Sequence, residues 1–394
     1  MEMVRQVEEI IEIIMIKKIK EYNNLRKYLK YINNLYGEYF LKDIMSEFKT
    51  LKENIDNGVY KGIIVYSTAV MWEPIQRPHH FLKSFADDGY LCFFCETNLK
   101  ENYVIKEKFK NVYLVNGEEK LIPLIKDQKV IFLITYFLQY VFARYFDNKV
   151  VWFDLLDRLD FMSYHNLYSK KVYSEIIENA DIITYTSNNL KHYLNGNKNA
   201  ILVPNGANVE DFRIENGCIV PDDMENILKD NKPILGYFGA IEKWFDFKLI
   251  NALDKSDKYN IVLIGKIGDN LNYEKYNFKN VYFLGPKPFN ELKNYAKYFD
   301  VAMIPFIVNK LTNTVSPVKF YEYMALGLPV ITTPIYEMKQ YNLSILKFVN
   351  IDNVIKETDI LLNMNKKNIK EITKKVADDN TWKQRIEVVK EKLR

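Results

Sequence analysis

The sequence predicts an α/β fold of two Rossmann-like, doubly wound domains that face a cleft, with a helical extension before them. Its 394 residues exceed what one ordinary core holds. Strand-like and helix-like segments alternate from Lys61, give way to a polar, irregular linker over 207–232, and alternate again from Pro233. We therefore expect four parts: an extension (1–57), a first domain (58–210), a second domain (211–377) and a C-terminal helix (378–394) that crosses back to the first domain.

The extension is helical in composition. Its apolar side chains recur near the heptad period in two runs, from Val4 to Ile14 and from Leu25 to Leu35, and Lys18 interrupts the seam between them. It carries ten basic and ten acidic side chains, which disfavours a basic membrane-binding helix. We expect the extension either to mediate homo-oligomerisation or to pack as a helical hairpin on the catalytic body.

Runs of β-branched and aromatic residues predict the strands. In the first domain these runs are Ile63–Ser67, Tyr90–Cys95, Asn111–Val115, Val130–Thr135, Val150–Asp154, Asp181–Ser187 and Ala200–Pro204. In the second domain they are Pro233–Gly239, Tyr259–Gly265, Asn280–Gly285, Val301–Phe306 and Val330–Thr333. Helices are expected between them, including Arg77–Asp87 and Phe161–Asn179, and over Thr381–Leu393 at the end of the chain.

Composition argues against several classes of protein. A net charge of +4 without a basic cluster gives no support for nucleic-acid binding. Three cysteines cannot build a disulfide framework, so Cys92 and Cys95 are expected to be buried thiols in a reducing cytoplasm. Glutamates interrupt the apolar N-terminus, so no signal peptide is expected. The apolar run Val130–Ala143 is too short to span a bilayer. We expect a cytoplasmic protein, with contact at the inner face of the membrane as the alternative.

The stretch Ser316–Thr333 predicts a short helix followed by a strand. Ser316 is expected as its N-cap, with Pro317 at the first helical position. Gly327 and Pro329 are expected to end the helix. The start of such a helix attracts anions, because its N–H groups are unpaired and the dipole is positive there.

Two charges lie near this helix start. Lys319 falls in the first turn, and Glu322 follows at i+3 on the same face. A cation and a carboxylate at such a place suit a nucleoside diphosphate, since the cation takes the phosphates and the carboxylate takes the ribose hydroxyls. The alternative is an ordinary helix packed on a sheet, with both charges solvated.

This helix resembles the donor-binding helix of GT-B glycosyltransferases, especially the large retaining family 4 of group 1 enzymes. Other segments are similar to one bacterial subgroup in kind and order: Met71–His80, Val151–Asp157, Val203–Gly206, Gly236–Asp246, Asn280–Gly285 and Phe299–Phe306. The resemblance spans most of residues 61–394. It implies transfer of a sugar from a nucleotide-diphosphate sugar to a hydroxyl of a saccharide, lipid-linked or protein acceptor, in cell-surface glycan or glycoprotein assembly.

The resemblance also implies a donor site in the second domain. Its expected residues are Gly239, Ala240, Gly265, Lys266, Pro288, Phe289, Thr314, Ser316, Pro317, Val318, Lys319 and Glu322. Small residues at Gly239 and Ala240 let the backbone approach a diphosphate, and Lys266 supplies a second cation. A plain tight turn and a surface lysine are the alternatives. The segment around Pro288 and Phe289 is expected to hold the base.

On the acceptor side we expect Arg77, His79, Asp154 and Asp157. His79 follows the first strand, and the two aspartates end a strand, where a carboxylate orients a hydroxyl or acts as a base. They could equally cap the following helix. The residues expected to act in catalysis are Lys319, Lys266, Asp157 and His79.

One position departs from the family pattern. Many retaining members have Glu-x7-Glu, and counting back from Glu322 places Thr314 at the first glutamate. This leaves the sugar and the retaining outcome open. No Asp-x-Asp motif follows a strand, so we expect catalysis without a metal or other cofactor. A nucleotide-sugar epimerase of the same fold, or an inactive sugar-nucleotide-binding scaffold, are the alternative functions.

Overall fold

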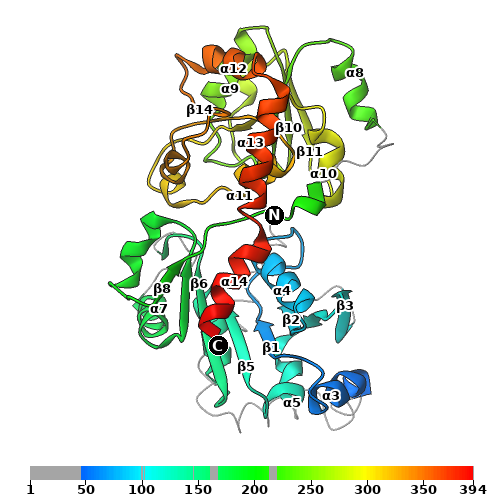
Figure 1. Ribbon diagram of the computed structural model, residues 1–394, viewed down its shortest axis with the longest axis vertical. Coiled ribbons are helices and arrows are strands. Elements are labelled where there is room, and N and C mark those ends of the chain that lie inside the picture. Colours follow the sequence, from blue (N-terminus) through cyan, green and yellow to red (C-terminus); the bar gives the residue numbers. More distant parts are fainter. Residues whose placement is uncertain are drawn as a thin grey trace. The chain divides into compact units, whose positions relative to one another are not determined.

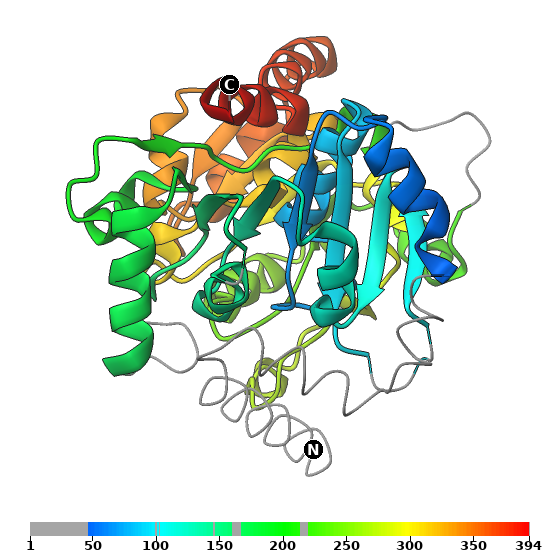
Figure 2. The same cartoon turned by 90° about the horizontal axis from the view of Figure 1, so that it is seen from below.

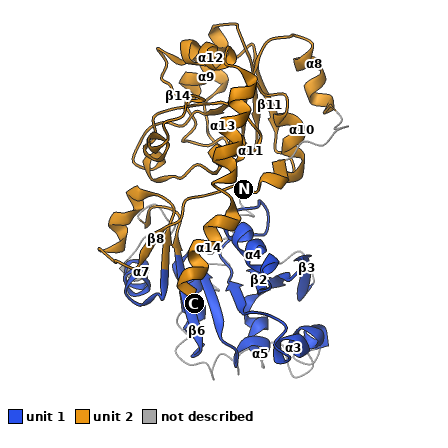
Figure 3. Ribbon diagram, viewed as in Figure 1, with its two compact units in different colours: residues 1–153, 166–182 blue, residues 154–165, 183–394 orange. Residues whose placement is uncertain are grey.

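A computed structural model of the chain describes residues 46–98, 101, 103–144, 146–159, 167–212 and 220–393. The chain divides into two compact units, which Figure 3 colours separately. Unit 1 comprises residues 1–153 and 166–182, and unit 2 comprises residues 154–165 and 183–394. The division places residues 183–210, which we expected in the first domain, with unit 2.

The first sheet contains every strand predicted for the first domain, and one more. Its order is β3-β4-β2-β1-β5-β6-β7-β8. The strands are β1 (Ile63–Tyr66), β2 (Leu91–Glu96), β3 (Ile105–Phe109), β4 (Val112–Asn116), β5 (Val130–Ile134), β6 (Lys149–Leu155), β7 (Ile182–Tyr185) and β8 (Ala200–Leu202). Central strand β1 pairs in parallel with β2 and β5, in the register Ile63 to Leu91 and Ile63 to Val130. Chain order therefore reverses between β1 and β5, which makes this a doubly wound sheet.

The central strands are buried on both faces, which is why they are continuous apolar runs. All six residues of β2 are buried, including Cys92 and Cys95, as predicted. The additional strand, β3, pairs antiparallel with β4 at the edge of the sheet. Its sequence Ile-Lys-Glu-Lys-Phe lacks the apolar run that marks the central strands. Such lysines are typical of exposed edge strands, where they oppose pairing with another chain.

Helices in the first half of the chain follow the prediction where they are described. They are α3 (Lys49–Asp56), α4 (Arg77–Asp87), α5 (Ile122–Ile125), α6 (Phe137–Ala143) and α7 (Leu167–Asn179). The expected helix start at Phe161 lies outside the described residues, as do both heptad runs of the extension. The described end of the extension is packed, since Phe48, Leu51 and Ile55 are buried. Figure 2 shows α3 in dark blue beside the cyan strands of unit 1.

The second sheet, in unit 2, has the strand order β11-β10-β9-β12-β13-β14. Its strands are β9 (Ile234–Phe238), β10 (Asn260–Ile264), β11 (Val281–Gly285), β12 (Val301–Ile304), β13 (Val330–Thr332) and β14 (Leu346–Phe348), all paired in parallel. In chain order this is 3-2-1-4-5-6, the arrangement of dinucleotide-binding folds, with the switch point between β9 and β12. Strand β14, of only three residues, was not predicted.

Helices complete unit 2 and are labelled in Figure 1. They are α8 (Glu225–Leu228), α9 (Phe247–Lys255), α10 (Leu292–Ala296), α11 (Val318–Ala325), α12 (Val354–Leu362), α13 (Lys366–Asp378) and α14 (Trp382–Leu393). The predicted linker is partly structured, because Phe212, Met224 and Ile227 join the core of this unit. In the described part of the chain, no helix combines the length and apolar character needed to cross a bilayer.

Candidate functional site

The predicted donor residues gather around the switch point of the second sheet. Gly239 follows β9 and Gly265 follows β10, the two neighbouring strands on one side of this point. Helix α11 comes after β12, the strand on the other side of β9. The carboxyl ends of parallel strands share one edge of a sheet, and open α/β sheets bind ligands there.

The two glycines allow their strand ends to touch through the backbone. Gly239 has φ +144° and Gly265 has φ +150°, values that residues with a side chain rarely adopt. A Cβ atom on Gly265 would lie 1.8 Å from the carbonyl oxygen of Gly239. The N–H of Gly239 in turn donates to the carbonyl of Ile264 at 2.8 Å. The requirement for glycine at 265 is therefore a backbone contact.

Helix α11 begins one residue later than predicted. Its first helical residue is Val318, and Pro317 occupies the capping position with φ −68° and ψ 109°. Ser316 therefore does not cap the helix. Its hydroxyl accepts the N–H of Asn205 at 3.3 Å, and its carbonyl accepts the Asn205 side-chain amide at 2.6 Å. The prediction for Ser316 failed because a partner distant in the sequence fixes its conformation.

The predicted end of α11 is confirmed. Gly327 has φ +79° and donates its N–H to the carbonyl of Met324 at 3.0 Å. Leu328 donates to Tyr323, also at 3.0 Å. These two bonds form a Schellman motif, in which a glycine with positive φ satisfies the last carbonyls of a helix.

Lys319 and Glu322 form an ion pair at the start of α11. Lys319 Nζ lies 2.7 Å from Glu322 Oε2, and their side chains are 19% and 5% exposed. The ammonium lies 4.9 Å from the centre of the Phe238 ring, on the last residue of β9. A Cβ atom on Gly239 would lie 3.0 Å from Lys319 Cε. A cation, a buried carboxylate and the glycine that follows β9 are thus neighbours.

Two tyrosines, Tyr237 and Tyr323, form hydrogen bonds that hold the end of β9 and the turn after it. The Tyr237 hydroxyl donates to the carbonyl of Ala240 at 2.8 Å and so fixes the turn after β9. Phe238 N–H donates to the hydroxyl of Tyr323 on α11 at 3.3 Å. Burial and, to a lesser extent, the Glu322 charge raise the pKa of Tyr237, so the phenol stays protonated and remains a donor.

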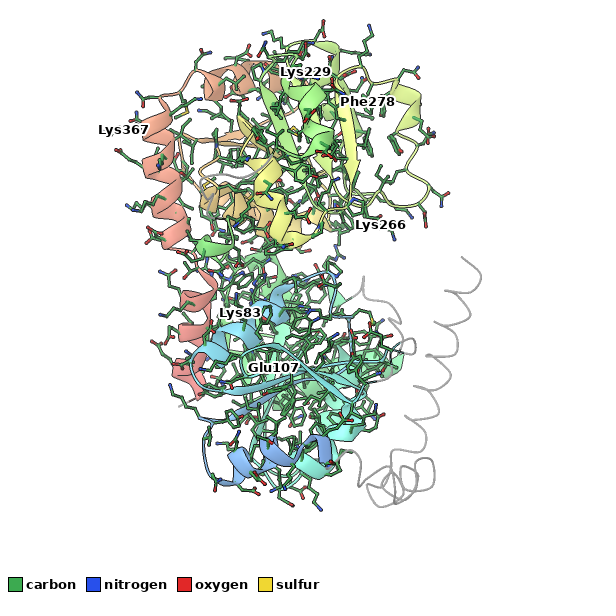
Figure 4. The ribbon with its side chains drawn as sticks, turned by 90° about the vertical axis from the view of Figure 1, so that its right-hand side faces the viewer. Lys83, Glu107, Lys229, Lys266, Phe278 and Lys367 are labelled. Atoms are coloured by element: carbon green, nitrogen blue, oxygen red, sulfur yellow. The ribbon has the colours of Figure 1, made fainter. Side chains whose placement is uncertain are left out.

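The other predicted donor residues lie at the same edge with different exposure. Lys266 is exposed after β10 and is labelled in Figure 4. Pro288 is exposed and precedes a 3-10 turn that starts at Phe289, whose ring packs edge-on against Phe212 at 5.6 Å. Thr314 is buried, and its hydroxyl donates to the carbonyl of Leu311 at 2.7 Å. Because the Thr314 hydroxyl already donates its hydrogen to Leu311, its oxygen can contact a ligand only as a hydrogen-bond acceptor.

On the acceptor side, Arg77 and His79 are buried in α4 of unit 1. The Arg77 guanidinium lies 4.3 Å from the Phe81 ring centre. His79 is the third residue of α4, and its Nδ1 accepts the N–H of Gln76 at 3.0 Å, which caps the helix. Its ring contacts those of Trp72 and Phe94, and burial lowers the pKa of His79 to about 4. A neutral imidazole that caps a helix is what the structure shows at this position; its predicted catalytic role stays a prediction.

Asp154 and Asp157, assigned to unit 2, differ in environment. Asp154 lies within β6, fully buried, and accepts the Thr184 hydroxyl at 2.5 Å. Asp157 follows the strand and is exposed to solvent. Protein atoms crowded around it raise the pKa of its carboxyl by desolvation. Solvent reaches the Asp157 side chain, whereas that of Asp154 is closed off. Asp157 is therefore the better placed of the two to act as a base.

Several polar residues near these strand ends escaped the sequence analysis. In unit 1, Gln139 is buried after β5, accepts the N–H of Thr135 at 2.7 Å and donates to the carbonyl of Ser67 at 2.7 Å. It lies inside an apolar run, where no spacing marks it. In unit 2, Glu337 is buried and accepts the hydroxyl of Ser187 at 2.9 Å. Desolvation raises the pKa of Glu337.

No group of three His, Cys, Asp or Glu side chains is arranged to hold a metal within the residues that the structure describes. Burial raises the pKa of both described thiols, Cys92 and Cys95, which keeps them protonated.

Comparison with known proteins agrees with this geometry. Residues 232–360, which contain the second sheet up to α12, match the model of the family described as Glycosyl transferases group 1. A candidate teichuronic acid biosynthesis glycosyltransferase, TuaH of Bacillus subtilis (strain 168), is 31% identical over 169 residues. That match covers 40% of this chain and 41% of TuaH, so it spans less than half of either protein.

Solved structures extend the likeness over most of the chain. Sucrose-phosphate synthase from Thermosynechococcus elongatus has a TM-score of 0.64 at 15% identity, covering 84% of this chain and 98% of that one. Anabaena Alr3699/HepE in complex with UDP and glucose has a TM-score of 0.60 at 13% identity, covering 84% and 99%. At such low identity these likenesses show the fold alone. The chain thus has the GT-B fold, and its residues 232–360 are similar to the glycosyl transferases of group 1.

Proposed function

We propose that this protein transfers a sugar from a nucleoside-diphosphate donor to a hydroxyl of an acceptor, with the diphosphate bound at the start of α11. The observation that supports this proposal most strongly is the position of Lys319. Its ammonium lies beside the glycine turn that ends β9, and Glu322 is 2.7 Å away. Because Gly239 has no side chain, the Lys319 side chain can lie against the backbone of this turn.

The proposed chemistry is stabilisation of the leaving group. The bond between the anomeric carbon and the phosphate oxygen breaks, and negative charge builds on the diphosphate. Lys319, the exposed Lys266 and the N–H groups at the start of α11 oppose that charge. The acceptor oxygen forms the new bond to the sugar, and its proton passes to a base, for which Asp157 is our candidate. Glu322 is left to accept the ribose hydroxyls.

Two finer features belong to the proposal. The two lysines supply the positive charge that a divalent metal supplies elsewhere, which supports catalysis without a metal. Retention of anomeric configuration rests on the resemblance to family 4, although Thr314 stands where many members have glutamate. Nuclear magnetic resonance of the product made from an α-linked donor would identify the anomer; a β-linked product would refute retention.

The nature of the substrates is also proposed. The Anabaena neighbour was solved with UDP and glucose, and TuaH is named for teichuronic acid. We infer a UDP-sugar donor, an acceptor in a cell-surface glycan, and action in the cytoplasm at the inner face of the membrane.

The direct test is a thermal-shift and turnover panel with UDP, GDP, ADP and their glucose conjugates. A ligand at 100 times its dissociation constant should add about 2.7 kcal/mol to the free energy of unfolding. A transferase releases nucleoside diphosphate, slowly by hydrolysis and faster with an acceptor. Isomerised sugar without release would identify an epimerase instead. Binding with neither reaction would identify an inactive homologue.

Lys319→Ala is the matching test of the site. Loss of one group that stabilises developing charge should lower turnover by roughly 10²–10³-fold with folding intact. Lys367→Ala is the control, since Lys367 projects from α13 into solvent in Figure 4. Equal turnover in both variants would mean that Lys319 is an ordinary surface lysine and that the diphosphate binds elsewhere.

A further inference from the structure

The segment that leads into α11 is held by residues far from it in the sequence. This segment, residues 309–317, is the later part of the connection from β12 to α11 and carries Thr314 and Ser316. Two of its backbone carbonyls accept hydrogen bonds from side-chain amides. Asn205 Nδ2 donates to the carbonyl of Ser316 at 2.6 Å, and Asn189 Nδ2 donates to the carbonyl of Asn313 at 2.9 Å. All of these residues belong to unit 2.

Asn205 is itself fixed in place. Its carbonyl accepts Arg385 Nε, from α14, at 3.1 Å. The next residue, Gly206, has no room for a side chain, because a Cβ atom would lie 2.8 Å from the carbonyl oxygen of Asn380. Ala207 and Asn380 are joined by a backbone bond of 3.1 Å. In Figure 1 the green chain after β8 meets the red chain between α13 and α14 at this place.

Asn189 belongs to a second set of bonds. Its neighbours Ser187 and Asn188 both donate to Glu337 Oε1 at 2.9 Å. Tyr336, next to Glu337, donates its N–H to the side-chain oxygen of Asn313 at 3.0 Å. Asn313 is therefore held through its carbonyl by Asn189 and through its side chain by Tyr336. Thr314 follows it directly.

We propose that Asn205 and Asn189 are positioning residues for the donor, each for a different part of it. Asn205 fixes the carbonyl just before α11, and so aims the helix start and Lys319 at the diphosphate. Asn189 fixes the turn that presents Thr314, and so acts on the sugar. The inference rests on the proposed function, because it assumes that the nucleoside diphosphate binds at α11.

The hydrogen bonds donated by the two amides should be sensitive to substitution of Asn205 and Asn189. A side-chain amide that donates to a backbone carbonyl defines the direction of that carbonyl, and an ionised carboxylate of the same shape cannot replace it, because it has no hydrogen to donate. A loss of about 1–2 kcal/mol in a half-buried bond corresponds to roughly 5- to 30-fold in an equilibrium constant. The effect reaches the ligand only if the segment moves once released.

The experiment is calorimetric titration of the full chain with UDP, GDP and ADP and with their glucose conjugates. The variants are Asn205→Ala, Asn205→Asp and Asn189→Ala. Asn205→Ala removes the amide without adding charge, and Asn205→Asp keeps the shape but removes the donor. Asn363→Asp is the control, since Asn363 Nδ2 also donates to a carbonyl, of Asp359 at 2.8 Å, at an exposed helix end.

Both Asn205 variants should bind the nucleoside diphosphate and the full donor about tenfold more weakly. Asn189→Ala should bind the nucleoside diphosphate as wild type does, and lose affinity or turnover only with the sugar present. Asn363→Asp should bind both normally. Thermal midpoints of all variants measure folding separately, and titration is run at least 15 °C below the lowest of them, a margin chosen so that each variant is still folded.

Three outcomes would overturn the inference. Wild-type affinity in the Asn205 variants would show that the helix start does not depend on the amide. Equal losses for both ligands in Asn189→Ala would show a general structural role. If wild-type protein binds none of the nucleotides, the proposed function fails together with this inference, whereas normal wild-type binding with unaffected variants refutes the inference alone.

Discussion

Glu322 is the clearest case in which a single residue separates two interpretations of the site. Its side chain is only 5% exposed and is paired with Lys319 at 2.7 Å. A solvated carboxylate on an ordinary surface helix would not be buried in this way, since burial of a charge is unfavourable without a partner. The sequence alternative of two solvated charges is therefore wrong. Whether the Glu322 carboxylate also binds the donor is tested by ligand titration.

If Glu322 accepts hydrogen bonds from the ribose hydroxyls, Glu322→Ala should lower the affinity for the nucleoside diphosphate and for the full donor alike. Loss of such charge-assisted bonds costs about 1.5–3 kcal/mol, or roughly ten- to a hundredfold in affinity. Thr314→Ala should leave nucleoside diphosphate affinity unchanged and alter only binding or turnover of the sugar nucleotide. Calorimetry with both ligands checks this, with Glu371→Ala on the exposed face of α13 as control. Equal losses at Thr314, or none at Glu322, would mean that the donor lies differently.

His79 makes the free energy of unfolding depend on pH. Its folded pKa is about 4 against an ordinary 6.5, so the unfolded chain binds the proton more tightly. The stabilisation is complete above pH 6.5 and is lost as the pH falls from 6.5 towards 4. The total is about 3 kcal/mol, from 1.36 kcal/mol per pKa unit.

His79→Gln tests this, because a glutamine at this position can keep the reciprocal cap with Gln76 without titrating. Urea unfolding of both proteins between pH 7 and 4.5 gives the comparison, which removes the contribution of carboxylates common to both. The wild type should lose more stability than the variant over this range. Parallel pH profiles would show that His79 is not buried as a neutral ring.

At the scale of elements, the sequence predicted the strands better than their boundaries and contacts. Buried parallel strands such as β2 and β5 are unbroken apolar runs, so composition alone finds them. The strands β3 and β14 were missed because lysines interrupt their apolar residues: β3 is Ile-Lys-Glu-Lys-Phe and β14 is Leu-Lys-Phe. Helix α11 was found with its end correct, since Gly327 acts locally. Its start was displaced because Asn205, 111 residues away, holds Ser316.

The candidate site divides in the same way. Lys319, Glu322, Gly239 and Gly265 were predictable because each acts through local spacing or through a glycine at a strand end. Asn189, Asn205 and Glu337 act through hydrogen bonds across the fold. Only Asn205 lies in a segment that the resemblance marked, and no periodicity reveals such partners. What the sequence could not supply was the set of contacts that holds the site in place.

The ends of β10 and β11 offer a matched pair of glycine substitutions, at Gly265 and Gly285. Gly265→Ala should lower the free energy of unfolding by about 2–4 kcal/mol, because its Cβ would lie 1.8 Å from the Gly239 carbonyl oxygen at φ +150°. Gly285→Ala, at φ +69° in the last residue of β11, meets nothing within 4 Å and should cost only about 1–2 kcal/mol of backbone strain.

Thermal unfolding of the two variants measures this difference, and UDP titration measures its effect on the site. Gly265→Ala should also bind nucleotide more weakly, since the Gly239 turn must move to admit the methyl group. Similar midpoints for the two variants would show that the contact between the turns is looser than the structure has it.

At the scale of the whole molecule, the extension and the body are not separated at residue 57. In the last part of the extension, Leu51 and Ile55 of α3 and Phe48 just before it are buried, so this part contributes to unit 1. Heptad runs lie in the residues before Lys49, outside the described part of the chain. The two candidate roles of the extension, packing on the body and self-association, can therefore belong to different stretches of it.

Two truncations distinguish these stretches. Removal of residues 1–45 leaves α3 intact and should leave the thermal midpoint nearly unchanged. Removal of residues 1–57 deletes three buried side chains worth about 1.5–3 kcal/mol each and should lower the midpoint clearly. Light scattering of both proteins and the full chain measures mass. If the heptad runs mediate self-association, removal of residues 1–45 should be enough to convert the oligomer to a monomer, and the thermal midpoint of that monomer should be normal. An unchanged mass would restrict the extension to packing, and equal midpoints for both truncations would show that α3 does not stabilise unit 1.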